Sequence, residues 1–139
     1  MAAVYLSIIF QERQLSLGNQ AVRSITVVLL ITTFHAHAQE WKTLNDEGMS
    51  HYRGGQYAAA EHLFLKAVEK SEASYGSTSS EYITSLTNAA YAQKMLSDFD
   101  KAARNFGKVL HVVESLHSGP HIDRIEAIIN LANVYLPAG

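Results

Sequence analysis

The 139-residue sequence contains no cysteine and only two prolines, Pro120 and Pro137. The first absence excludes disulfide bonds, zinc sites with thiolate ligands and cysteine nucleophiles. The second leaves residues 41–116 without a proline that would interrupt a helix. Charge is also scarce: the formal net charge is −2, which favours neither DNA nor an anionic membrane as a partner. Residues 41–116 are rich in good helix formers, so we expect an all-α fold.

The N-terminal part of the chain has the order of segments found in a secretory signal peptide. Arg23 precedes an apolar run, residues 25–34, and Ala36-His37-Ala38 follows this run. The run is too short to span a bilayer, which needs about 20 helical residues. We therefore predict that residues 1–38 contain a signal peptide, that cleavage follows Ala38, and that the protein is exported to a bacterial periplasm or beyond. The alternative is a buried strand, because the run is rich in β-branched residues.

Residues 1–21 form an unusually long N-terminal extension before this segment. A non-standard bacterial start codon at Val22 would give a compact signal peptide instead. We therefore hypothesise that residues 1–21 are an artefact of the gene model. The mature domain is predicted to be residues 39–139.

The rest of the chain repeats itself at a constant offset of 42 residues, the separation of Leu44 from Leu86. This shift pairs Leu44 with Leu86 and Ile128, Gly48 with Ala90 and Ala132, Tyr57 with Phe99, Ala60 with Ala102, and Phe64 with Phe106. Small residues align with small residues, and aromatic residues with aromatic residues. Apolar spacing of three and four residues then predicts helices at 40–53, 57–73, 80–96, 99–117 and 121–136.

Local signals mark where these helices begin and end. Asp98 is placed to cap one helix, and Thr78 with Glu81 has the spacing of a capping box. Pro120 suits a first-turn position. Gly54–Gly55 is predicted to form the turn between two antiparallel helices. Ser97 replaces a glycine of this turn, so we expect an ordinary backbone conformation there.

This pattern resembles the tetratricopeptide repeat, in the 42-residue variant of kinesin light chains and many bacterial secreted proteins. The residues that carry the resemblance are Gly48, Gly55, Tyr57, Ala60, Phe64, Ala67, Ala90, Phe99, Ala102, Phe106, Val109 and the run from Asn130 to Tyr135. It covers residues 40–136 and implies a right-handed α-solenoid of antiparallel helix pairs, with about two and a half repeats. Ala60 is then expected where the first helix, at Gly48, crosses closest. Trp41 is expected to cap the open end.

Residue patterns for catalysis or cofactor binding are missing. His117 and His121 have a helical spacing, but Ser118-Gly119-Pro120 between them interrupts the helix that a metal pair would share. The sequence has no phosphate-binding glycine loop and no serine in a nucleophile elbow. We predict no enzyme, no metal and no cofactor.

Helical repeats instead present a concave groove formed by the first helix of each unit. The resemblance implies that Asn88 and Asn130 contact the ligand backbone there, with Asp46 as their counterpart in the first unit. An amide both donates and accepts, so it can hold a peptide without reading its side chains. The other residues predicted to line this groove are Lys42, Asn45, Met49, Tyr52, Arg53, Thr87, Tyr91 and Lys94. The alternative is an inter-helix hydrogen bond for the asparagines, and plain exposed surface for the rest.

The predicted function is a non-catalytic, exported scaffold that binds a peptide or a partner helix, and neither nucleic acid nor a membrane. Alternatively, the chain is the leading repeat portion of a larger protein, such as a caspase-like peptidase or a sensor kinase. The helix at 121–136 is apolar around most of its surface, as expected of a helix covered on both sides. We therefore expect a truncated frame or fragment, and self-association through this helix.

Overall fold

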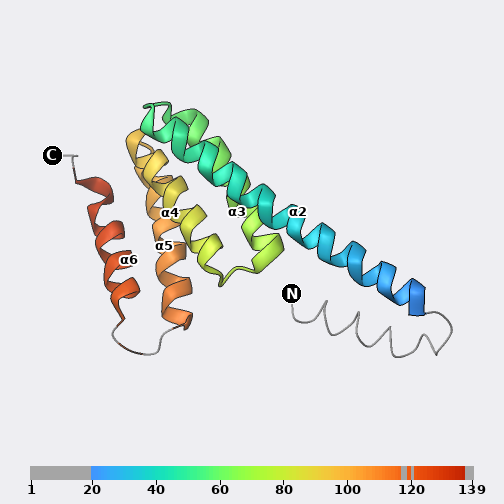
Figure 1. Cartoon of the computed structure of the whole chain (residues 1–139). Helices are drawn as coiled ribbons and strands as arrows, with labels where there is room; N and C mark the ends of the chain where they lie inside the picture. Colours follow the sequence, from blue (N-terminus) through green and yellow to red (C-terminus); the bar gives the residue numbers. More distant parts are fainter. Residues whose placement is uncertain (1–19, 117–118, 120, 137–139) are drawn as a thin grey trace.

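The computed structural model describes the backbone of residues 20–116, 119 and 121–136, and the side chains of residues 26–28 and of the described residues from Glu40 onward. The helices are α2 (Gln20–Arg53), α3 (Tyr57–Tyr75), α4 (Ser80–Met95), α5 (Phe99–Leu116), α6 (Ile122–Ala132) and the short 3-10 helix η1 (Asn133–Tyr135). No strand occurs in this part of the chain. Each helix packs against the next one in sequence, which forms the helix pairs of an α-solenoid (Figure 1). The predicted all-α fold is confirmed.

Helix α2 begins at Gln20, well before the predicted start at residue 40. The apolar run at residues 25–34 is therefore helical, and the strand alternative for this run is wrong. The physical reason is that a helix pairs its own backbone N–H and C=O groups, whereas a strand needs a neighbour. The early part of α2, including the exposed Val27 and Val28, extends away from the other helices (Figure 1). The hypothesis on residues 1–21 concerns positions almost all outside the described part of the chain, which begins at Gln20.

The described helices include no segment with the length and apolarity that crossing a membrane requires.

The two turns inside the helix pairs lie at equivalent positions of the two repeats and have the same backbone geometry. In the first, Gln56 N donates to His51 O at 2.9 Å around Gly55, whose φ is +74°. In the second, Asp98 N donates to Gln93 O at 2.8 Å around Ser97, whose φ is +63°. Both are Schellman turns, in which the residue after the helix is left-handed. The expectation of an ordinary conformation at Ser97 is therefore wrong, because this turn imposes the left-handed one on serine as well.

Other helix ends differ from the expected ones in detail. The residue that caps α4 is Ser79, not Thr78: Ser79 Oγ accepts from Tyr82 N at 3.1 Å. Asp98 precedes α5 as predicted, and its carboxylate pairs with Lys101 at 2.5 Å. Helix α6 begins after His121, whose ring accepts from Asp123 N, and its last turn tightens into η1. Helix α3 continues to Tyr75, and Pro120 lies outside the described residues.

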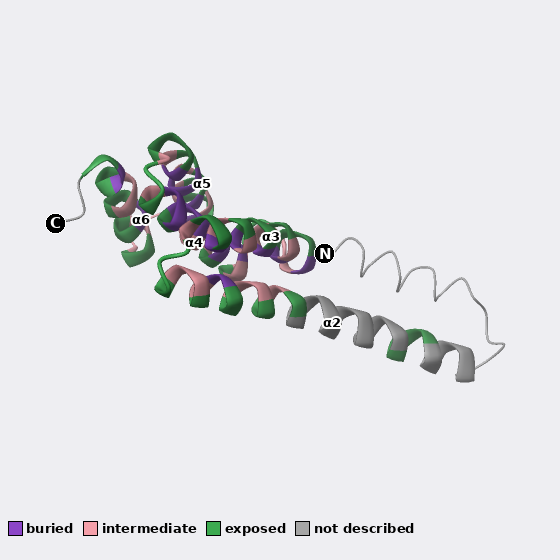
Figure 2. Ribbon diagram, turned by 90° about the horizontal axis from the view of Figure 1, so that it is seen from above, coloured by how far each residue is buried: buried purple, intermediate pink, exposed green. Residues whose placement is uncertain are grey.

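The core follows the line of small and aromatic residues that the repeat aligns. Ala60, Phe64, Ala102 and Phe106 are all buried, as expected, and buried residues gather where α3, α4 and α5 face one another (Figure 2). A Cβ added at Gly48 would meet the ring of Phe64. Ala60 shares a cluster with Phe64 and with Ala89 and Ala92 of α4.

Trp41 has a different role from the predicted one. Its Nε1 donates to Ser85 Oγ of α4 at 2.7 Å, and its ring packs edge-on against Tyr75 of α3. Beside it, Glu40 pairs with Lys70 of α3 at 2.9 Å. Trp41 thus joins the first repeat to the second instead of covering an open end.

Candidate functional site

The first helices of successive repeats are joined by side-chain hydrogen bonds. Between α2 and α4, the Asn88 amide donates to Asn45 Oδ1 at 2.9 Å. Between α4 and α6, the Tyr91 hydroxyl donates to Asn130 Oδ1 at 2.8 Å. Each asparagine therefore bonds to the first helix of the preceding repeat, which fixes the stacking of α2, α4 and α6. The inter-helix alternative considered for these asparagines is present in the structure.

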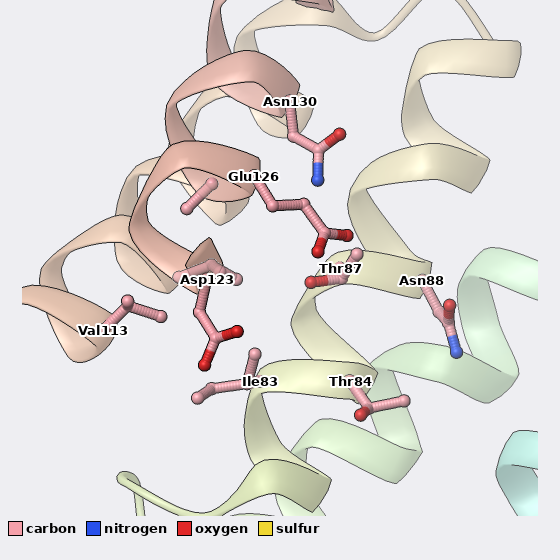
Figure 3. Close-up of a pocket in the computed structure, with 10 residues that line it drawn as sticks. Ile83, Thr84, Thr87, Asn88, Val113, Asp123, Glu126 and Asn130 are labelled. Carbon is pink, nitrogen blue, oxygen red and sulfur yellow. The ribbon is translucent and has the colours of Figure 1, made fainter. Parts of the chain in front are cut away.

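A hollow of about 260 Å³ lies between α4 and α6; we call it the α4–α6 hollow. Its lining comes from α4, α5 and α6 and consists of Ile83, Thr84, Thr87, Asn88, Val109, Val113, Asp123, Glu126, Ala127 and Asn130. Asp123, Glu126 and Asn130 extend from α6 toward α4, whereas Asn88 extends away from α6 (Figure 3). The base is apolar, because Val109, Val113 and Ala127 are buried core residues.

The lining of the α4–α6 hollow includes two carboxylates, Asp123 and Glu126, and no basic side chain. Burial raises the pKa of the Tyr91 hydroxyl, the negative charge of Glu126 raises it further, and the hydrogen bond to Asn130 lowers it. The two carboxylates make the lining of the hollow acidic.

The structure brings together three of the predicted groove residues, Thr87, Asn88 and Asn130, in the α4–α6 hollow. Other predicted groove residues on α2 and α4 form ion pairs or hydrogen bonds outside the hollow. Lys42 and Asp46 pair with each other at 2.5 Å, and Lys94 Nζ donates to the Asn133 carbonyl at 2.6 Å.

The remaining predicted residues of α2 divide between core and surface. Met49 and Tyr52 are half-buried and pack against the cluster around Phe64. Burial raises the pKa of Tyr52, with smaller contributions from Tyr57 and Tyr91. Arg53 is exposed at the end of the helix.

Seven residues that line the hollow were not predicted as groove residues: the buried Val109, Val113 and Ala127, together with Ile83, Thr84, Asp123 and Glu126. A helical signal for three of them exists. Glu126 and Asp123 precede Asn130 by four and seven residues, and Thr84 precedes Asn88 by four, so they share its helix face. Thr84, Asp123 and Glu126 could therefore have been predicted from their helical spacing to the two asparagines.

Comparison with protein families gives one match: the tetratricopeptide repeat, over residues 42–115. This match spans more than half of the chain. The chain belongs to the tetratricopeptide repeat family. Repeats of this family generally mediate protein–protein interaction and are not catalytic. Searches of the curated proteins and of the solved structures gave no match.

The histidines of this tetratricopeptide repeat protein are dispersed. His51 contacts Gln56, His121 caps α6, and His62 and His111 are exposed. Within the part of the chain that the structure describes, no three histidine or acidic residues are grouped so that they could hold a metal ion. His117, the other member of the pair considered from the sequence, lies outside that part.

Proposed function

We propose that this chain is a non-catalytic interaction scaffold that binds an extended peptide or a partner helix across α2, α4 and α6. One observation carries the proposal: the α4–α6 hollow lies between two first helices and has Asn88 and Asn130 among its lining residues. Clefts of this kind, with an apolar base and a few polar groups, are where proteins hold ligands.

The hydrogen bonds of the two asparagines are compatible with this role. Asn88 uses one N–H toward Asn45, and Asn130 uses its oxygen toward Tyr91. A primary amide has two N–H donors and an oxygen with two lone pairs, so each side chain retains further hydrogen-bonding capacity for a peptide backbone. The inter-helix bonds hold the amides in a fixed orientation, which reduces the entropy lost on binding.

The test is a selection of phage-displayed random dodecapeptides on the whole chain, followed by titration of synthetic copies of the selected peptides. We expect Asn130→Ala to weaken binding by about tenfold, since an amide in a peptide groove makes charge-free hydrogen bonds worth about 1 kcal/mol each. His111→Ala is the matched control, because His111 is exposed on α5. Equal affinities of the two variants, with unchanged helical content, would place the ligand elsewhere.

We also propose that the protein is exported, with a mature N-terminus at Gln39. Support comes from the sequence pattern of residues 22–40. Glu40 and Trp41, which contact α3 and α4, follow the predicted cleavage site. Cleavage after Ala38 leaves both contacts in the mature chain. Removal of the preceding segment is therefore compatible with a folded repeat domain.

A third proposal concerns the outer face of α6, where Ile122, Ile125, Ile128 and Ile129 are exposed. Ile128 corresponds to Leu86 of the preceding repeat, which is only 1% exposed because the next helix covers it. We propose that a second copy of this chain covers the α6 face in solution. In a longer reading frame, such as one leading into a peptidase or sensor-kinase domain, the following helix would occupy the same face. Translation of the DNA beyond the codon for Gly139 tests this alternative.

A further inference from the structure

The α4–α6 hollow combines an apolar base with an acidic rim. Val109, Val113 and Ala127 at the base are 5%, 3% and 2% exposed. Asp123 and Glu126 at the rim are exposed and extend from α6 toward α4 (Figure 3). A ligand that fits both parts needs an apolar stem and a positively charged end.

The size of the hollow points to a side chain rather than to a whole small molecule. Its volume of about 260 Å³ is below the range of roughly 300–1,000 Å³ that is typical of small-molecule sites. Lysine and arginine side chains have the matching chemistry, because their methylene stems pack on apolar surface while the charged end stays at the edge. Guanidinium and ammonium groups also make strong charge-assisted hydrogen bonds to carboxylates.

The basic side chains of the described neighbourhood do not fill this role. Arg124 of α6 pairs with Glu114 of α5 at 3.1 Å. Lys94 donates to the Asn133 carbonyl, toward the other end of α4. His121 lies 3.3 Å from Asp123 and adds positive charge only when it is protonated. Glu126 makes no ion pair with a basic side chain of the described residues.

We infer that the α4–α6 hollow receives one arginine or lysine side chain of the bound peptide, with its stem on Val109, Val113 and Ala127 and its charged end between Asp123 and Glu126. This inference rests on the proposed peptide-binding function and adds to it the chemical class of the ligand. An acidic or phosphorylated side chain would be repelled by the two carboxylates. A purely apolar side chain would remove water from the Glu126 carboxylate without replacing its hydrogen bonds, which is costly.

The experiment uses the selected dodecapeptides and the whole chain. The strongest binder is synthesised twice, with arginine at the basic position and with citrulline there, which removes the charge of arginine and keeps its shape. Both are titrated against the wild type, an Asp123→Asn/Glu126→Gln variant and, as matched control, Glu69→Gln on the exposed surface of α3. The substitutions are isosteric and surface-exposed, and circular dichroism checks the helical content.

We expect every selected family of peptides to contain arginine or lysine at one fixed position. Citrulline is expected to weaken binding to the wild type by about tenfold or more, since a charged pair in an interface contributes strongly. It should weaken binding to the Asp123→Asn/Glu126→Gln variant by less than about twofold. The Glu69→Gln variant should behave as the wild type. Raising NaCl from about 50 to about 300 mM should weaken only binding of the charged peptide.

Three results would overturn the inference, and the first two would do so without contradicting the proposed function. Peptides that lose affinity in Asn130→Ala but tolerate citrulline would leave the groove valid and remove its cationic preference. N-acetyl-arginine methylamide that competes as strongly as the peptide would make the hollow a site for free cations. Failure to select any peptide would contradict the proposed function and this inference together.

Discussion

The ring of Phe64 on α3 occupies the space where a side chain at Gly48 of α2 would stand. A Cβ placed on Gly48 would lie 2.7 Å from Phe64 Cε1 and 2.8 Å from Cδ1. Phe64 is completely buried, so its ring has little room to move. In the second repeat, Phe106 packs in the same cluster as Ala90, the residue equivalent to Gly48. The two repeats therefore pack the same pair of positions at different distances.

Replacing Gly48 with alanine should destabilise the protein. Overpacking against Phe64 is expected to cost roughly 1–3 kcal/mol, more than the gain of about 1 kcal/mol that alanine has over glycine in a helix. Gly107→Ala is the matched control in α5, because a Cβ there meets no atom within 4 Å. Gly107→Ala should stabilise by about 0.5–1 kcal/mol. Urea unfolding of both variants checks this, and equal effects would contradict the packing at Gly48.

Replacing Ser97 with glycine should stabilise the protein. Ser97 has a φ of +63°, a conformation that costs a residue with a Cβ about 1–2 kcal/mol. Part of this gain is lost because glycine has more freedom in the unfolded chain, so we expect a net gain of about 0.5–1 kcal/mol. Such a change raises the melting temperature by roughly 2–8 °C in a domain of this size. Ser77→Gly, in a loop where φ is not positive, should give no rise; a similar rise there would refute the strain argument.

Leucine at Ala60 or Ala102 should destabilise both helix pairs. The two alanines are fully buried, and larger side chains at such positions typically cost roughly 1–3 kcal/mol. The total stability of a short repeat array is expected to be a few kcal/mol, so this loss should be large in a thermal melt. Ala59→Leu is the control, because Ala59 is exposed on the same helix as Ala60. An unchanged midpoint for Ala102→Leu would mean that α4 and α5 do not pack as described.

Intact-mass measurement of protein from the native host should give a chain that begins at Gln39. The expected mass includes the loss of ammonia if this glutamine cyclises. The mature protein should be found outside the cytoplasm, and cell fractionation followed by immunoblotting measures this. A cytoplasmic pool that retains residues 34–38 would contradict the proposed export.

The isolated chain should self-associate through the outer face of α6. We expect the weight-average mass in sedimentation equilibrium to rise with protein concentration, because the isoleucines there are exposed. An Ile125→Lys/Ile129→Lys variant should stay monomeric, while Leu65→Lys, at an exposed leucine of α3, should behave as the wild type. A monomer at high concentration whose α6 amides are protected from hydrogen exchange would disprove the proposal.

The repeat and its helix pairs could be predicted from the sequence. The constant repeat period, the small and aromatic positions and the glycine turn are local or strictly repeated features, so their meaning does not depend on exact helix angles. Ala60, Phe64, Ala102 and Phe106 could therefore be predicted as core residues. Asn88 and Asn130 line the α4–α6 hollow, and the role in ligand binding that the resemblance implied for them stays a prediction.

The way in which these helices contact one another could not be predicted from the sequence. The hydrogen bond of Trp41 to Ser85, the bond of Asn88 to Asn45 and the α4–α6 hollow each join residues that lie far apart in the sequence. Such contacts depend on the angle and register between packed helices, which residue spacing does not specify. The left-handed conformation of Ser97 has a similar origin: the closing hydrogen bonds of the turn and the packing of α4 on α5 impose it on a residue that does not favour it.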